Sequence, residues 1–465
     1  MQLAGGGHAH ARMSTQTKLN DLVGLVLLAF LALAPLPLGG NRPFFWVAGA
    51  AFLAVLGLVY GLLLAAGGRT LRYPLTRIPE VAGLAAILIC HLVLQLLPIA
   101  PLLGRATRTF GGGVTVVSST ISLAPGPTAL MLIQLAGYAM LFFLVAQVAV
   151  NPHRGRHMLR VLFWVTVAYA VYGLVSLTQL GDTLLGLEKW AYPGSATGTF
   201  VNRNSFATFL AFGAVMGAAI AIELAAPEPD RPAARAWLGE FVLVLVGVIF
   251  LVGALLATQS RMGVAAASVG ALVVVVGGLW RARITAGHWL AAAAIAVALV
   301  GGLVYLFGLG LLERLGSVES SADVRFQLYQ QVAQMIAAEP WFGHGGGSFA
   351  AVFPLFHQLP VSPDLVWDMA HSTYLALWAE LGFVAGSLPL LIVAALVLRM
   401  LPGLAGEPRQ RTPILAAIGM VVVAAIHSTV DFGLEIQANA QLLLAVLAIA
   451  TAATGWPRSR GESTT

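Results

Sequence analysis

The 465-residue chain contains little charge: 9% of its residues are Asp, Glu, Lys or Arg, whereas 59% are hydrophobic. A water-soluble globular protein carries about 25% charged residues, so this composition excludes a soluble globule and predicts a polytopic membrane protein. The formal net charge of +6 would suggest nucleic acid as a partner of a soluble protein. Here the basic residues lie mostly in short loops between apolar runs, where they act as topology signals. We therefore expect membrane lipids, and no nucleic acid, as partners.

Cysteine is nearly absent, because Cys90 is the only one in the sequence. A single cysteine can form no intrachain disulfide and can assemble no cysteine-based zinc or redox motif. The sequence also lacks the paired carboxylates of a glycosidase, a helical His-Glu zinc motif and a Walker loop. We therefore expect neither a bound metal nor a cofactor.

Long apolar runs are abundant, and each is close to the roughly 20 residues that span a hydrocarbon core. Twelve such runs can be placed, which predicts an all-α polytopic integral membrane protein with about twelve transmembrane helices. They are Leu22–Leu38, Phe44–Ala65, Val81–Leu97, Thr128–Val150, Leu159–Leu180, Ser205–Ala226, Phe241–Ala257, Gly263–Leu279, Trp289–Leu312, Ser372–Leu398, Ile414–Val430 and Ile436–Gly455.

The positions of lysine and arginine predict how these runs are oriented. If the N-terminus is cytoplasmic, 17 of the 25 basic residues fall on the cytoplasmic side, which is the bias of the positive-inside rule. A cleaved signal peptide ending near Ala34 is an alternative, but the first run is longer than a usual signal core. The predicted order of segments along the chain is a cytoplasmic tail (1–20), transmembrane helices 1 to 9 (21–312), a periplasmic loop (313–370), transmembrane helices 10 to 12 (371–456) and a cytoplasmic tail (457–465).

The long periplasmic loop contains a predicted amphipathic helix. Ser320 or Ser321 can cap its N-terminus, and Pro340 ends it. Its apolar residues recur at helical spacing: Val324, Leu328, Val332, Met335 and Ile336. The glycines at 343–347 follow no strand, so the sequence does not favour a nucleotide-binding loop. Earlier in the chain, three glycines at 111–113 precede the β-prone run Val114–Ile121, which predicts a short hairpin or strand on the outer surface.

Three arginines and one histidine on the outer side are candidate functional residues. Arg203 and Arg261 lie at the outer ends of spans, where an arginine is costly unless it faces a partner or a polar cavity. Each can reach lipid headgroups or pair with a carboxylate, or it can clamp a phosphate, which a guanidinium binds bidentately. Arg325 lies in the first turns of the amphipathic helix, where a solvated position is the alternative. His371 begins the tenth span and suits proton abstraction near neutral pH, with an interfacial polar residue as the alternative.

Three further polar residues lie within or near the ends of spans. Glu380 is nine residues after His371 and therefore on the opposite helical face, so we expect it to hold an arginine or cap a buried network. His427 and Asp431 are four residues apart, which places them on one face of a helix. The favoured interpretation is a hydrogen-bonded structural pair, and a role beside a site is the alternative.

Five segments follow one another in an order that surrounds the long loop. They are Gly198-Thr-Phe-Val-Asn-Arg-Asn-Ser-Phe-Ala, Ser260-Arg261, Glu339-Pro-Trp-Phe-Gly-His-Gly, Ala370-His-Ser-Thr-Tyr-Leu-Ala-Leu-Trp-Ala-Glu-Leu-Gly and Ile426-His-Ser-Thr-Val-Asp-Phe. Together they resemble the bacterial O-antigen ligase and O-antigen polymerase family of membrane glycosyltransferases. The similarity is strongest from about Thr199 to Asn439.

The resemblance implies a multi-pass enzyme of the bacterial inner membrane with a periplasmic active face. Such enzymes transfer a glycan from undecaprenyl pyrophosphate to an acceptor hydroxyl without a nucleotide sugar or metal. The acceptor is the lipid A core for a ligase and another lipid-linked glycan for a polymerase. Carried onto this sequence, the family pattern places Arg203, Arg261 and Arg325 at the pyrophosphate and His371 near the acceptor. A proton-coupled transporter or lipid-glycan flippase is the alternative from another class, but the internal repeat expected of such folds is not found.

Overall fold

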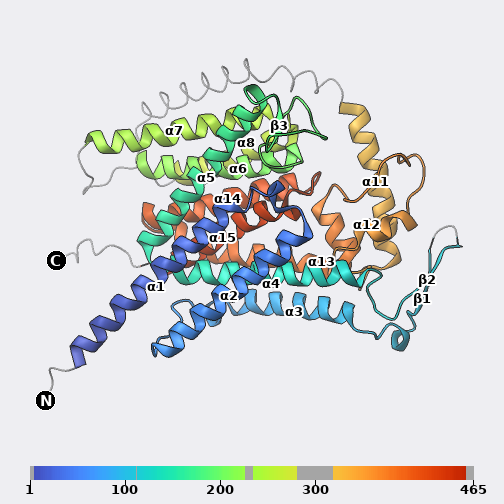
Figure 1. Cartoon of the computed structure of the whole chain (residues 1–465), viewed down its shortest axis with the longest axis horizontal. Coiled ribbons are helices and arrows are strands. Elements are labelled where there is room, and N and C mark those ends of the chain that lie inside the picture. The colour runs from blue at the N-terminus through green and yellow to red at the C-terminus, as the bar shows by residue number, and fades with distance from the viewer. Residues whose placement is uncertain (1–4, 111–112, 226–233, 280–317, 457–465) are drawn as a thin grey trace.

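The computed structural model describes residues 5–110, 113–225, 234–279 and 318–456. Its long helices run roughly alongside one another and form a layered bundle (Figure 1). Their bounds are α1 Gly5–Leu33, α2 Pro43–Ala66, α3 Pro79–Leu96, α4 Pro125–Ala149, α5 Pro152–Thr178, α6 Arg203–Ala225, α7 Ala234–Ala257, α8 Arg261–Leu279, α13 Thr373–Met400, α14 Pro408–His427 and α15 Gln437–Ala453. Short 3-10 turns join them at Leu38–Gly40, Leu75–Arg77, Pro101–Leu103, Leu401–Ala405 and Gly433–Glu435.

The helices confirm the predicted all-α polytopic membrane protein. In the part of the chain that the structure describes, nine helices are long and apolar enough to cross a membrane, and α15 is a shorter apolar helix. Every predicted apolar run in that part falls on one of the helices, whereas the ninth run, Trp289–Leu312, lies outside the described residues. Helix α1 begins at Gly5, so most of the predicted N-terminal tail (1–20) is helical.

Helix α6 is the most deeply buried of the membrane-crossing helices in the described part of the chain. Of its membrane-crossing stretch, 83% is buried inside the protein, and it packs against α7, α8 and α14. Helices α8 and α14 approach each other closely where Gly270 faces Gly419, because a Cβ at Gly270 would lie 2.8 Å from the Gly419 carbonyl oxygen. Small residues allow such close packing of helix backbones, which stabilises helices in a membrane.

The remaining elements lie toward one end of the bundle, which we call the loop end (Figure 1). They are α11 Val318–Ala338, α12 Phe349–Val352, a 3-10 turn at Phe353–Leu355, and the hairpins β1 Thr107–Thr109 with β2 Thr115–Val117 and β3 Thr183–Leu184 with β4 Leu187–Glu188. Helix α1 begins and α15 ends at the opposite end, the terminal end.

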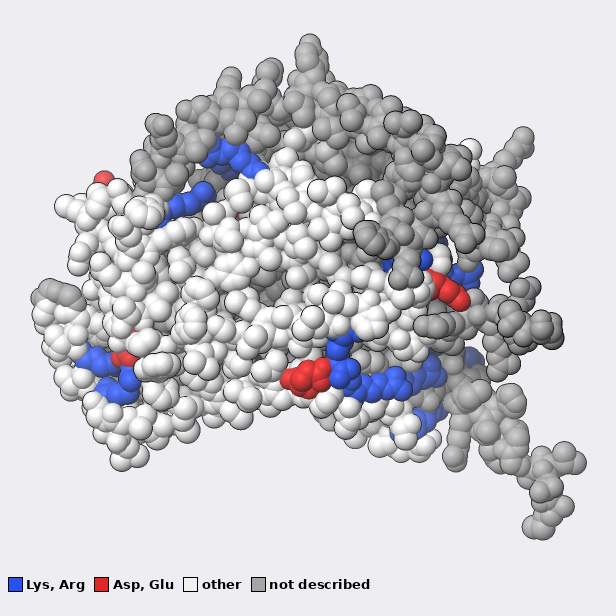
Figure 2. Space-filling model, turned by 180° about the vertical axis from the view of Figure 1, so that it is seen from behind, with Lys and Arg blue, Asp and Glu red and all other residues white. Residues whose placement is uncertain are grey.

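On the face in Figure 2, lysines and arginines form separate patches with uncharged surface between them.

Two predicted elements of the loop end are confirmed. The β-prone run forms strand β2, which pairs antiparallel with β1 so that Arg108 faces Val116. The amphipathic helix is α11, which begins at Val318, slightly before the expected cap. Leu328, Val332 and Met335 are fully buried in a small core at the loop end. The helical spacing therefore predicted the burial of these three residues correctly, whereas Val324, which belongs to the same pattern, is 41% exposed.

Helix α13 is broken at Gly382, where φ is 79° and ψ is 165°. The break accommodates the loop that follows α11: Phe383 N donates to Pro340 O at 2.7 Å, and Gly345 N donates to Glu380 O at 2.9 Å. The Glu380 carboxylate accepts from Gly347 N at 2.9 Å and from Phe349 N at 3.0 Å. Glu380 thus caps a buried network, which was one of its two predicted roles.

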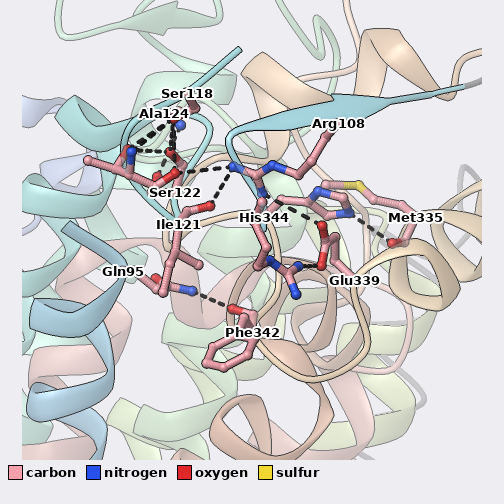
Figure 3. Close-up of polar contacts among 12 residues, drawn as sticks. Gln95, Arg108, Ser118, Ile121, Ser122, Ala124, Met335, Glu339, Phe342 and His344 are labelled. Atoms are coloured by element: carbon pink, nitrogen blue, oxygen red, sulfur yellow. Dashed lines mark hydrogen bonds and ion pairs between the residues drawn. The ribbon is translucent and has the colours of Figure 1, made fainter. Parts of the chain in front are cut away.

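Glu339 connects the β1–β2 segment to this loop, as Figure 3 shows. It forms ion pairs with Arg105 and with Arg108, whose Nη1 lies 3.7 Å from Glu339 Oε1. Arg108 Nη2 also donates to Ile121 O at 2.8 Å. Burial, followed by repulsion from Arg105, lowers the pKa of Arg108 to about 10, so this guanidinium stays charged at neutral pH. These arginines hold the β1–β2 hairpin against the bundle.

Candidate functional site

A cavity of about 320 Å³ lies where the start of α6, the α7–α8 turn, α11 and the end of α14 meet. Its walls are Arg203, Asn204, Gln259, Ser260, Arg261, Met262, Arg325, His427, Val430 and Asp431. Three of the four predicted site residues, Arg203, Arg261 and Arg325, are therefore brought together from distant parts of the sequence. The fourth, His371, is not among the lining residues.

Arg203 is the first residue of α6. The Asn202 side chain caps this helix, because its Oδ1 accepts from Asn204 N at 2.7 Å and from Ser205 N at 3.3 Å. The Arg203 guanidinium lies over the Tyr192 ring, 5.3 Å from its centroid, and its Nη1 lies 3.4 Å from Ser195 Oγ. A capped helix start and a stacked guanidinium give a fixed positive charge at the cavity wall.

Arg261 is likewise the first residue of its helix, α8. The turn before it is held by side chains: Thr258 Oγ1 accepts from Ser260 N at 3.2 Å, and Ser260 Oγ accepts from Gly263 N at 3.3 Å. Two helix N-termini therefore begin at the cavity, each starting with an arginine. Because backbone N–H groups and the helix dipole favour anions at an N-terminus, the arrangement suits an anionic ligand.

Asp431 is the acidic member of the cavity wall, and it is 1% exposed. Its Oδ1 accepts from Asn204 Nδ2 at 3.5 Å, and its Oδ2 has no hydrogen-bond partner among the described residues. Burial raises the pKa of Asp431 to about 7, although the Arg325 guanidinium acts to lower it. This carboxyl group therefore titrates near neutral pH.

His427 also lines the cavity, and its Nδ1 lies 2.7 Å from Thr208 Oγ1. His427 and Asp431 thus have different side-chain partners, and the favoured interpretation of the two as a bonded pair is not what the structure shows. Helix α14 ends at His427, so Asp431 lies beyond it. The alternative interpretation, a position beside the site, describes both residues. The motif around Arg203 did not identify Asn204 as a wall residue, although it follows Arg203 directly.

His371 lies in the turn before α13 with a φ of 52°, a conformation that non-glycine residues seldom adopt. The prediction that His371 begins the span is wrong by two residues, because α13 begins at Thr373. The His371 ring packs against Phe432, the residue after Asp431, with 5.2 Å between centroids. Its Nδ1 is buried without a hydrogen-bond partner among the residues that the structure describes. Burial, with repulsion from Arg325, lowers the pKa of His371 to about 4, so the imidazole is neutral at pH 7.

Taken together, the cavity has three guanidinium groups and one carboxyl group with a raised pKa. The wall also includes the His427 imidazole, whereas the His371 ring packs against Phe432, the residue that follows the wall residue Asp431. Guanidinium forks match the geometry of phosphate oxygens better than ammonium groups do. The site can therefore bind a compact, multiply charged anion and place a hydroxyl near a proton acceptor.

In a comparison with protein families, residues 246–390 match the family model described as O-antigen ligase. Comparison with curated proteins finds no match to the chain. The matched region contains Arg261, Arg325 and His371, whereas Arg203 and Asp431 lie outside it. The predicted resemblance is confirmed: residues 246–390 of this multi-pass membrane protein are similar to the O-antigen ligase family.

Proposed function

We propose that the protein transfers a glycan from undecaprenyl pyrophosphate to an acceptor hydroxyl at the periplasmic face of the bacterial inner membrane. The proposed acceptor is the lipid A core, as in an O-antigen ligase. The main observation in support of the proposal is that Arg203, Arg261 and Arg325 line one cavity at the ends of membrane helices. A lipid-linked diphosphate needs such a site, because its phosphates lie at the membrane boundary while its polyprenyl tail stays in lipid.

The arginines are proposed to hold the diphosphate and to stabilise it as a leaving group. When the bond between the anomeric carbon and the phosphate oxygen breaks, negative charge accumulates on the diphosphate. Fixed guanidinium groups that bind this charge more strongly in the transition state than in the ground state accelerate the reaction. In this proposal the arginines take the role that a metal ion has in other phosphate-transferring sites, so the reaction is metal-independent.

His371 is proposed to accept the proton of the acceptor hydroxyl, or to orient that hydroxyl for attack. Its lowered pKa keeps the imidazole neutral at pH 7, which is the form that can accept a proton. A positioned base contributes about 10²- to 10⁴-fold. The acceptor oxygen attacks the anomeric carbon from the face opposite the diphosphate, so the configuration at that carbon is inverted.

Asp431 is a second candidate for the proton acceptor, because it lines the cavity itself and its pKa lies near neutral pH. The two candidates predict different pH profiles. A transfer rate that falls only below about pH 5 supports His371. A rate that falls below about pH 7, and no longer does so in Asp431→Asn, would move the role to Asp431.

A polymerase that adds lipid-linked repeat units is the alternative within the same family, since it would use the same cavity with another acceptor. A proton-coupled transporter or flippase is not favoured. Such a protein would need a proton carrier within a span, and Glu380 lies within α13. Its carboxylate accepts hydrogen bonds from two backbone N–H groups of the loop, which supports a structural role.

The proposal is tested with Arg261→Ala and His371→Ala, measured as glycan transfer in membranes that contain equal amounts of each variant. We expect Arg261→Ala to lower transfer by at least about 10²-fold, as removal of one charge-stabilising donor does in other enzymes. His371→Ala should lower it by a similar factor. Arg42→Ala is the matched control, because Arg42 is exposed at the start of α2 and does not line the cavity, and its guanidinium donates to the neighbouring Asn41 O.

Full transfer by either variant would refute the role assigned to that residue. Deletion of the gene then separates ligase from polymerase by gel analysis of lipopolysaccharide. Loss of all glycan on the lipid A core, with lipid-linked chains accumulating, identifies a ligase. Products that carry a single repeat unit identify a polymerase.

A further inference from the structure

Arg325 reaches the cavity from α11, a helix whose C-terminal half packs into the core at the loop end. In that half Leu328, Val332 and Met335 are buried in the loop-end core. Gln331 and Gln358 exchange two hydrogen bonds, of 2.6 and 3.1 Å. Near Arg325, by contrast, the Phe326 side chain is 63% exposed. The position of Arg325 therefore depends on the contacts that α11 makes in the next turn.

Tyr329 lies one turn after Arg325, on the same face of α11. Its hydroxyl donates to His371 O at 2.8 Å and lies 3.3 Å from Thr429 O. Thr429 belongs to the turn that places Val430 and Asp431 in the cavity wall. One hydroxyl group thus connects α11 to the turn of His371 and to the turn of Asp431.

The contact is well suited to fix these three segments. The peptide that Tyr329 holds follows His371, whose positive φ must be maintained by surrounding contacts. Burial raises the pKa of Tyr329, so the phenol remains a donor at neutral pH. The side chain itself is not part of the cavity wall, so it can act only through the residues that it positions.

We propose that Tyr329 is a positioning residue that holds Arg325 at the diphosphate and couples it to the turns of His371 and Asp431. The inference rests on the proposed function, because it assumes that the cavity binds a diphosphate. It goes beyond that function by assigning the geometry of the site to a hydroxyl outside the cavity.

The test uses the full-length protein purified in detergent and inorganic pyrophosphate as the probe, so that binding is measured separately from transfer. Tyr329→Phe removes only the hydroxyl and should weaken pyrophosphate binding about two- to tenfold, the range expected for one lost hydrogen bond. Tyr374→Phe is the matched control, because the Tyr374 hydroxyl also donates to a backbone carbonyl, Ala425 O, at 2.8 Å, and neither residue lines the cavity. The control should bind within twofold of wild type.

A double-mutant cycle distinguishes positioning from a general loss of stability. In an Arg325→Ala background, Tyr329→Phe should cause no further loss of binding, because the guanidinium on which it acts is gone. The thermal unfolding midpoints of Tyr329→Phe and Tyr374→Phe should be similar, since each removes one phenol hydroxyl that donates to a backbone carbonyl oxygen.

Three results would overturn the inference alone: wild-type affinity in Tyr329→Phe, an equal loss in Tyr374→Phe, or the same loss with and without Arg325. Absence of saturable pyrophosphate binding in the wild type would overturn the proposed function and this inference together. The two failures are therefore distinguishable in one experiment.

Discussion

At the scale of single residues, the cavity combines fixed positive charges with one group whose charge changes near neutral pH. Arg203 and Arg261 each begin a helix, so a guanidinium and a helix N-terminus act on the same ligand. Asp431 opposes them only when it is ionised. Burial alone would keep this carboxyl group neutral, and the Arg325 guanidinium partly restores its charge. The net charge of the cavity therefore depends on the protonation of Asp431.

This dependence predicts how diphosphate binding changes with pH. Because the pKa of Asp431 is raised to about 7, the carboxyl group is mainly protonated at pH 6 and mainly ionised at pH 8. An ionised carboxylate repels a diphosphate, so wild-type affinity for inorganic pyrophosphate should rise as the pH falls from 8 to 6, by up to about tenfold relative to Asp431→Asn. Pyrophosphate itself titrates in this range, and the comparison at each pH removes its contribution. If the affinities of the wild type and Asp431→Asn for pyrophosphate changed in parallel with pH, the prediction would be contradicted.

The place of Asp431 in the cavity could be predicted only in part. The four-residue spacing from His427 suggested a shared helical face, but α14 ends at His427 and the chain turns before Asp431. The positions of Arg203 and Arg261 at helix ends were predictable, because hydrophobic runs define the ends of spans. That they line one cavity together with Arg325 was implied by the family resemblance alone. No local sequence pattern indicates which helix ends lie side by side.

At the scale of elements, the break in α13 depends on the loop that follows α11. Gly382 adopts a conformation that is essentially restricted to glycine, and an added Cβ would clash with the Trp341 carbonyl oxygen. The sequence predicted one continuous span here, because hydrophobicity continues through the break. The backbone of Gly382 is constrained by the Trp341 carbonyl, about forty residues earlier in the sequence. By contrast, α11 and the β2 strand were predictable, because their patterns are local.

Gly382→Ala should therefore destabilise the protein by at least about 1 to 3 kcal/mol, from backbone strain before the clash is counted. Thermal unfolding of the purified protein, followed by the fraction that remains soluble after heating, measures the effect. Gly83→Ala is the matched control: Gly83 lies within α3, and a Cβ added there has no neighbour within 4 Å. It should leave the midpoint unchanged or raise it, since alanine favours helix more than glycine does. An unchanged midpoint in Gly382→Ala would show that the break is not required.

At the scale of the whole molecule, the arginines at the two ends of the bundle have different surroundings. At the loop end, Arg203, Arg261 and Arg325 line the cavity, and Arg105 and Arg108 pair with Glu339. At the terminal end they follow the topology bias, and several are neutralised by carboxylates, as in the pairs Arg156–Glu223 and Arg399–Glu80. An excess of basic residues beside membrane helices favours the cytoplasmic side. The charge distribution therefore supports the proposal that the cavity opens to the periplasm.

Sidedness can be tested with single cysteines, because the chain has only Cys90 to remove. In a Cys90→Ser background, Val366→Cys probes the loop end and Leu75→Cys probes the terminal end; the wild-type side chains are 92% and 49% exposed. In spheroplasts, a membrane-impermeant thiol reagent should label Val366→Cys and should reach Leu75→Cys only after the membrane is permeabilised. Both variants keep Arg203, Arg261, Arg325 and His371, so transfer activity can be checked in the same cells. The opposite labelling pattern would place the cavity in the cytoplasm, where a periplasmic transfer from undecaprenyl pyrophosphate is impossible.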